Sequence, residues 1–160
     1  MEPEAESAWD LDAVLVGAGV DAAIAVVAAT LALPERVRWP AFAGVLAGGL
    51  LGGYLAGRLA AGSWRRRPRH GLLAGVVGGA AFALAVRWSF EPGTPPGALR
   101  PANYLLATAA GWFPSGFTAR YDALIGVAAA LAFGVLYAVE GALAAGAAPG
   151  DESGIVAVRE

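Results

Sequence analysis

The chain has no cysteine, no lysine and a single histidine among its 160 residues. Without cysteine it forms no disulfide, thiolate zinc site or iron–sulfur cluster, and one histidine leaves little for metal or triad chemistry. Only 15% of the residues are charged, whereas a soluble domain carries about 25%. The net charge of −2 argues against nucleic acid as a partner, because binding phosphate groups requires a surplus of basic surface.

What the chain does contain is mostly apolar: hydrophobic residues make up 58% of it, and the mean hydropathy is +0.59. A helix of about 20 apolar residues crosses a bilayer core about 30 Å thick. Four stretches reach that length, so we expect an all-α integral membrane bundle of four transmembrane helices. The expected spans are residues 13–33, 39–61, 71–90 and 122–143, which form a membrane domain (13–143) between an acidic tail (1–12) and a C-terminal tail (144–160).

The connection between the third and fourth spans, residues 91–121, begins with a turn-rich run of proline and glycine. Within it, residues 102–113 form an apolar run of 12 behind Pro101, which is too short to cross a membrane. We expect a short interfacial helix here, with Trp112 and Phe113 at the level of the lipid headgroups. A re-entrant helix, or a short helix that caps the bundle, remains an alternative.

Arginine is concentrated in the connection between the second and third spans, which contains Arg65, Arg66, Arg67 and Arg69. Because positive charge favours the cytoplasmic side, we expect this connection and both termini in the cytoplasm, with the chain in the cell membrane. The count over the whole chain is less one-sided, with six arginines inside and five outside. The same four arginines could bind anionic lipid headgroups, and the adjacent His70 fits a headgroup-level position better than a metal site.

Glycine recurs at every fourth position in three of the four spans. Residues four apart lie on one helix face, so each row is a surface that another backbone can approach closely. We interpret the rows as packing the second span against the third in a hairpin; the alternative is that one row stays free as a homo-oligomer interface. The glycines are Gly44, Gly48 and Gly52, with Gly49, Gly53 and Gly57 one position over, then Gly71, Gly75 and Gly79, and finally Gly126 and Gly134.

The second and third spans also carry a resemblance. The segment GGLLGGYLAG (48–57), the basic turn and the segment HGLLAGVVGG (70–79) resemble the glycine-rich hairpin of small haloarchaeal membrane proteins of unknown function. The resemblance implies a membrane location and a helical fold. Because those proteins have no assigned activity, it implies no catalytic residues.

Asp21 falls near the middle of the first span, where an ionised carboxylate costs roughly 2.5–3.5 kcal/mol by insertion scales. Its neighbours on the same helix face are small, among them Gly17, Ala18 and Ala25, so Asp21 should point into the bundle and away from lipid. One interpretation is a carboxylate that responds to a proton or a cation. The other is a protonated or hydrogen-bonded aspartate that fastens the first helix to a neighbour.

Three further polar residues, chosen by their depth in the membrane, could complete a path for a proton from Asp21 toward the inside: Tyr54, Tyr137 and Glu140. Hydrolase, zincin, glycosidase and phosphate-binding constellations all lack members, so we expect neither an enzyme nor a cofactor nor a metal site. The favoured function is that of a non-enzymatic structural or accessory membrane protein, which contacts lipid and packs with copies of itself or another membrane subunit. The alternative is a small oligomeric transporter or channel subunit with Asp21 as its coupling carboxylate.

Overall fold

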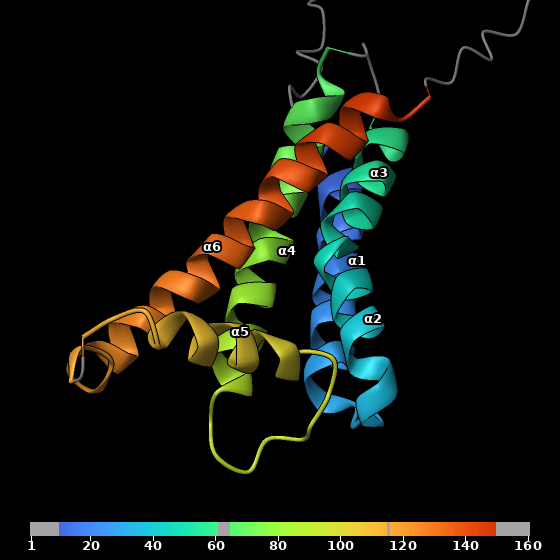
Figure 1. Cartoon of the computed structure of the whole chain (residues 1–160). Helices are drawn as coiled ribbons and strands as arrows, with labels where there is room; N and C mark the ends of the chain where they lie inside the picture. The colour runs from blue at the N-terminus through green and yellow to red at the C-terminus, as the bar shows by residue number, and fades with distance from the viewer. Residues whose placement is uncertain (1–9, 61–64, 115, 150–160) are drawn as a thin grey trace, which may run out of the picture.

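The structure is a computed structural model that describes residues 10–60, 65–114 and 116–149, and every regular element in these ranges is an α-helix. Figure 1 shows α2 and α3 following one another along the same line, with α1 and α4 beside them and α6 leaning outward. The helices are α1 (Leu11–Thr30), α2 (Glu35–Leu46), α3 (Gly48–Leu59), α4 (Arg67–Ser89), α5 (Arg100–Ala110) and α6 (Phe117–Ala147).

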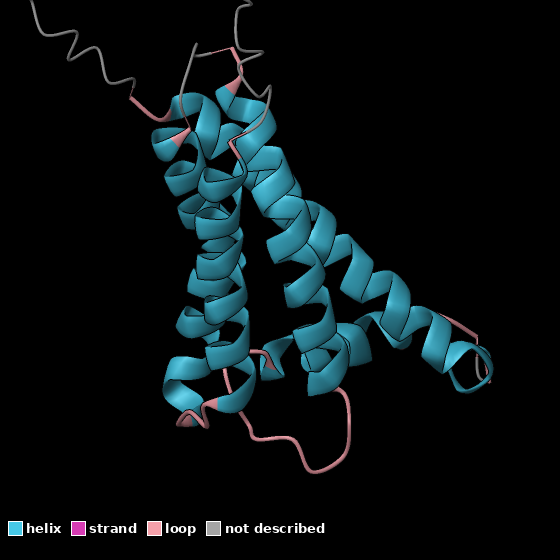
Figure 2. Ribbon diagram, turned by 180° about the vertical axis from the view of Figure 1, so that it is seen from behind, coloured by secondary structure: helices cyan, strands magenta, loops and turns pink. Residues whose placement is uncertain are grey.

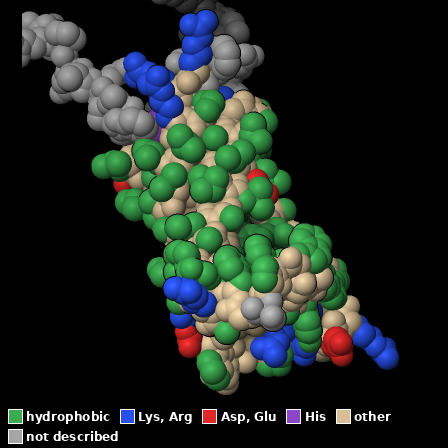
Figure 3. All heavy atoms as spheres, turned by 60° about the vertical axis from the view of Figure 1, so that its left-hand side comes forward, with side chains coloured by type: hydrophobic (Ala, Val, Ile, Leu, Met, Phe, Trp, Pro, Cys, Tyr) green, Lys and Arg blue, Asp and Glu red, His purple; other side chains and the backbone are tan. Residues whose placement is uncertain are grey.

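Four helical segments are long and apolar enough to cross a membrane: α1, the consecutive pair α2–α3, α4 and α6. Their outer surfaces carry large apolar side chains; Leu15, Leu84 and Leu143 are 65%, 72% and 67% exposed. On the face drawn in Figure 3, hydrophobic side chains cover the middle and the arginines gather toward the two ends. An apolar surface of this extent is suited to lipid rather than water. The prediction of an all-α, multi-pass membrane protein is confirmed at this level.

The ends of the first span follow from local hydrogen bonding. Asp10 precedes α1, and its Oδ1 accepts a hydrogen bond from the backbone N–H of Ala13 at 3.2 Å, which caps the helix. The helix ends at Thr30, because the chain becomes extended at Leu31 (φ −81°, ψ 114°) before Pro34. The span therefore stops before the predicted residue 33.

The third and fourth spans both begin earlier than predicted. α4 starts at Arg67, so part of the expected basic turn is helical. α6 starts at Phe117 after Gly116, whose φ of +85° suits glycine, and it is kinked at Tyr121 (φ −118°, ψ 18°). The predicted start at residue 122 therefore coincides with this kink and not with the start of the helix.

Hydrogen bonds hold three helix ends together at one end of the molecule. The backbone N–H of Asp10 donates to His70 Nε2 at 3.0 Å, which joins the start of α1 to the start of α4. Arg67 Nη1 donates to the carbonyl of Ala148 at 3.1 Å, which joins the start of α4 to the end of α6. The start of α1, the start of α4 and the end of α6 therefore lie on the same side of the helices.

The opposite end carries the α1–α2 turn, the loop after α4 and helix α5 (Figure 2). The backbone N–H of Leu33 donates to the carbonyl of Pro96 at 3.1 Å, which fastens the loop to the turn. α5 covers Arg100–Ala110 and not residues 102–113, and it lies across the ends of the spans. Trp112, just beyond it, is 85% exposed.

The helices pack around a central aromatic cluster on α2, α4 and α6. Phe82 stacks on Tyr137 with ring centroids 4.4 Å apart and 17° between the planes. Phe133 meets both Phe82 and Phe42 edge to face at 6.1 Å. α4 and α6 form the most extensive helix contact, while α1 packs against α4 and α3, and α3 packs against α6. This arrangement brings the middle of α1, α3 and α6 together.

Candidate functional site

The second span is broken at Ala47, where the sequence predicted one continuous helix over 39–61. Ala47 has φ −84° and ψ 5°, and the N–H of Leu50 returns to the Ala47 carbonyl at 3.2 Å, which is the tighter spacing of a 3₁₀ turn. Gly48 and Gly49 follow at once, and glycine favours the helical conformation weakly. Backbone groups at the break are therefore free to bind side chains from other helices.

Tyr137 of α6 occupies one side of this break. Its side chain is fully buried, and its Oη donates a hydrogen bond to the carbonyl of Val45 at 2.5 Å. In an unbroken helix this carbonyl would accept from the N–H of Gly49. The phenol thus supplies a donor to a backbone acceptor at the break, and backbone polar groups inside a membrane need such partners.

Asp21 of α1 lies on the inner side of α3, just beyond the break, and is 0% exposed. Its Oδ1 accepts a hydrogen bond from the backbone N–H of Gly52 at 3.1 Å. Its Oδ2 is buried and has no hydrogen-bond partner among the described residues. A Cβ atom added at Gly52 or at Gly78 of α4 would overlap the Asp21 side chain. Glycine on two helices therefore makes the space that the carboxylate fills.

Glu140 of α6 is the second acidic group at the break. The backbone N–H of Gly49 lies beside its carboxylate, and its Oε2 is buried without a hydrogen-bond partner among the described residues. Glu140 and Tyr137 both border Gly49, and Asp21 borders Gly52 three residues further along α3. The first turns of α3 direct backbone N–H groups toward these carboxylates, and the positive end of a helix dipole favours negative charge there.

Tyr54 is not part of this site. Its hydroxyl accepts a hydrogen bond from Arg58 Nη1 at 3.3 Å on the exposed side of α3, four residues along the chain. Tyr54 shares that side with Leu50, whose side chain is 42% exposed. The structure thus brings together Asp21, Tyr137 and Glu140, whereas depth alone had also selected Tyr54.

Two participants in the site were missing from the sequence analysis. Gly78 packs against Asp21 from α4 but falls outside the rows of every fourth residue that we singled out. The carbonyl of Val45 becomes a hydrogen-bond acceptor because of the break. The adjacent glycines Gly78–Gly79 could have pointed to Gly78. The role of the Val45 carbonyl has no signal in the sequence, because it depends on a tyrosine 92 residues away.

The glycine rows of α3 and α4 face α6. A Cβ at Gly53 would overlap the backbone of Gly141, and one at Gly57 would lie 2.5 Å from Ala145 Cα. From α4, a Cβ at Gly75 would lie 2.7 Å from the Tyr137 carbonyl oxygen. Gly49, Gly71 and Gly79 likewise meet α6, Gly134 of α6 returns the contact to Gly79, and Gly48 meets Tyr137.

The expectation that these glycine rows pack the second span against the third therefore changes. α3 and α4 do contact each other, but their glycines serve mainly to bring both helices onto the backbone of α6. Gly44 has open space where a Cβ would stand, and Gly126 has only the ring of Phe90 nearby, at 3.7 Å. The row that starts at Gly44 therefore does not continue as one interface, because Gly48 and Gly52 turn inward to Tyr137 and Asp21.

The basic residues lie at the end of the molecule that holds the start of α4. Arg65 and Arg66 are exposed, Arg69 is exposed in the first turn of the helix, and Arg67 is partly buried. His70 is 2% exposed: its Nε2 accepts from the N–H of Asp10, and its Nδ1 lies 3.0 Å from the Arg66 carbonyl, so the proton belongs on Nδ1. His70 therefore joins helix ends from a buried position, at the end of the molecule where the arginines lie.

Within the described ranges, no group of three or more histidine, cysteine or acidic side chains is placed to hold a metal ion. The site consists instead of two carboxylates, one phenol and backbone groups at a helix break. Comparison of the chain with protein-family models, curated proteins and solved structures found no match.

Proposed function

We propose that this protein is a small transporter or channel subunit that binds a proton at the buried carboxylate of Asp21 and the partly buried carboxylate of Glu140. The observation that carries the proposal is the position of Asp21. It is wholly buried in a membrane span, with one oxygen on the Gly52 N–H and the other without a hydrogen-bond partner among the described residues. Ionisable groups inside spans are costly to keep, and they commonly mark paths for ions or protons.

The packing around Asp21 favours a proton over a larger ligand. Gly52 and Gly78 approach the side chain so closely that neither position has room for a methyl group. A proton on Oδ2 needs no additional space, and it removes the charge that makes burial costly.

The helix break supplies a way for the site to change. Tyr137 holds the Val45 carbonyl, and Glu140 lies one helical turn further along the same face of α6. Broken helices beside buried charges are a recurring feature of membrane transporters, in which half-helix ends contact the transported ion. Gain or loss of the proton would alter the attraction between the start of α3 and the two carboxylates.

Proton flux in reconstituted liposomes tests the proposal. The wild-type protein should dissipate an imposed pH gradient, read by an internal pH-sensitive dye, and Asp21→Asn should reduce the rate to that of protein-free vesicles. Asn keeps a side-chain oxygen for the Gly52 N–H, so the variant should elute and melt like the wild type. Asp122→Asn is the matched control, because Asp122 is exposed near the kink of α6.

An Asp21→Asn protein that is folded and has unchanged proton flux would contradict the proposal. A wild-type protein that moves no protons under either a pH gradient or a membrane potential would do the same. Glu140→Gln then measures whether the second carboxylate belongs to the same site, since its loss should also slow the flux.

A second candidate is a non-enzymatic structural or accessory membrane protein. It is supported by the use of Asp21 and Tyr137 as anchors that fasten α1 and α6 to the backbone of the second span. Its partners would be lipid and either copies of this chain or another membrane subunit. Native mass spectrometry of the gently solubilised complex identifies an accessory role by a foreign subunit; if only copies of this chain are found, the flux of the Asp21→Asn variant separates the two candidates.

The proposal includes a location and an orientation. We place the protein in the cell membrane with the arginine-rich end of α4 and both termini in the cytoplasm. α5 then lies at the outer interface, where Trp112 and Phe113 are 85% and 49% exposed. Aromatic side chains commonly occupy this depth.

A further inference from the structure

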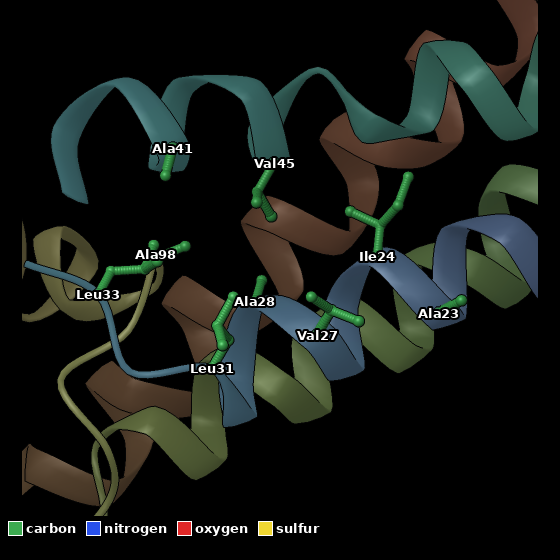
Figure 4. Close-up of a pocket in the computed structure, with 9 residues that line it drawn as sticks. All are labelled: Ala23, Ile24, Val27, Ala28, Leu31, Leu33, Ala41, Val45 and Ala98. Carbon is green, nitrogen blue, oxygen red and sulfur yellow. The ribbon is translucent and has the colours of Figure 1, made fainter. Parts of the chain in front are cut away.

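A groove runs between α1 and α2. Its volume is about 400 Å³, and all the residues that line it are apolar (Figure 4). α1 supplies one wall, α2 the other, and the loop after α4 closes one end with Ala98. The lining residues are Ala23, Ile24, Val27, Ala28, Leu31, Leu33, Ala41, Val45 and Ala98.

The groove exists because the second span is broken. α1 contacts α2, which precedes the break, far less than it contacts α3, which follows the break. The two walls of the groove, α1 and α2, therefore stand apart. Alanine lines much of the space, which leaves it unfilled. Gly97 packs against the carbonyls of Ala28 and Leu31, where a Cβ would lie 2.8 Å and 2.6 Å away, and so fixes the loop at the foot of the groove.

The groove lies at the depth of lipid hydrocarbon. Its walls belong to two of the four membrane-spanning segments. Val27 and Leu31 are 55% and 53% exposed, so the groove opens sideways toward the surrounding medium. In a membrane, that medium is lipid acyl chains.

A cation stands at the foot of the groove. Arg38, Ala41 and Val45 follow one another at intervals of three and four residues, so they lie on the same face of α2. Arg38 Nε donates a hydrogen bond to the carbonyl of Leu33 at 2.9 Å, which holds the partly buried guanidinium beside a lining residue. The groove therefore combines an apolar channel with a fixed positive charge at the end of the span.

We propose that this groove binds one acyl chain of an anionic membrane phospholipid and that Arg38 binds its phosphate group. The planar guanidinium presents paired N–H donors that suit phosphate oxygens. A transmembrane helix of a second copy fits less well, because a helix with side chains is about 10 Å across and Ala98 closes one end of the groove. The groove shares only Val45 with the carboxylate site, since its side chain lines the groove and its carbonyl binds Tyr137.

Lipid retention tests the site. The protein is reconstituted in vesicles with equal amounts of phosphatidylglycerol and phosphatidylcholine, extracted gently, and examined by native mass spectrometry for bound lipid. The wild type should retain one phosphatidylglycerol. Val27→Trp fills the groove and should lose it, whereas Val26→Trp, at a neighbouring position 58% exposed and outside the groove, should retain it. Ala23→Phe, at an exposed lining position, is a second filling variant.

The headgroup is tested separately. Arg38→Gln should lower the preference for phosphatidylglycerol about fivefold, the equivalent of about 1 kcal/mol for one arginine at the membrane surface. Arg36→Gln, at an exposed position on another face of α2, should leave the preference unchanged. Equal lipid retention by Val27→Trp, Ala23→Phe and Val26→Trp would overturn the proposal. So would a wild type without bound lipid whose self-association is lost in Val27→Trp, since that would assign the groove to a second copy.

Discussion

At the scale of single residues, Asp21 is held by backbone and by the absence of side chains. Its Oδ1 binds the N–H of Gly52, and its side chain fills space that Gly52 and Gly78 leave open. Glycine in a helix costs about 1 kcal/mol relative to alanine, so these positions carry a local cost. In return, glycine at these positions lets the helices approach closely and lets the carboxylate be buried.

Gly53→Ala should destabilise the protein, because the added methyl group would overlap the backbone of Gly141, which cannot rotate away. Overpacking of this kind costs about 1–3 kcal/mol. The measurement is the free energy of unfolding in mixed micelles, or the melting temperature in detergent.

Gly44→Ala is the matched control for that substitution. Gly44 has open space where the Cβ would stand. The free energy of unfolding of this variant should therefore equal that of the wild type or exceed it by up to about 1 kcal/mol. Equal melting temperatures for the two variants would show that α3 and α6 do not approach each other at Gly53.

Most of these residues could be found from the sequence, but the direction in which each side chain faces could not be predicted for all of them. Small neighbours indicated that Asp21 points inward, and its burial agrees with that. Depth selected Tyr137, Glu140 and Tyr54 alike, because depth does not say which way a side chain faces. The glycines of the second span did carry that information: Gly49, Gly52 and Gly53 define one face, and Tyr54 lies with exposed Leu50 on another.

At the scale of elements, the break in the second span links the two sites that we propose. Above Ala47, α3 brings its N–H groups to Asp21 and Glu140; below it, α2 stands away from α1 and leaves the groove. The four apolar spans were predictable from hydropathy and length. The break was not, because the side chain that binds the Val45 carbonyl there belongs to Tyr137, which is 92 positions away.

Tyr137→Phe should destabilise the backbone at the break, while the aromatic ring still fills the space between Phe82 and the second span. The ring still stacks, but the Val45 carbonyl loses its donor, and interhelical hydrogen bonds in membranes contribute about 0.6–2 kcal/mol. We expect a fall of that size in the free energy of unfolding and faster hydrogen exchange of the amides near Ala47. Tyr121→Phe, at the kink of α6 and 37% exposed, should change neither; equal effects of the two substitutions would contradict the assigned hydrogen bond.

At the scale of the whole molecule, the hydrogen bonds at the helix ends define two sides. Asp10, His70, Arg67 and Ala148 join the start of α1, the start of α4 and the end of α6 on one side. Leu33 and Pro96 join the α1–α2 turn and the loop after α4 on the other. Four spans with this connectivity place the described ends of the chain on the same side of the membrane.

The absence of cysteine makes this arrangement directly testable, since each introduced thiol is the only one in the chain. Asp12→Cys and Pro149→Cys should react with a membrane-impermeant maleimide only after the cells are opened, whereas Glu35→Cys and Pro92→Cys should react in intact cells. All four positions are exposed. Labelling of residues 12 and 149 from opposite sides would contradict the four-span arrangement. Labelling of both from outside would preserve it and reverse the orientation inferred from the arginines.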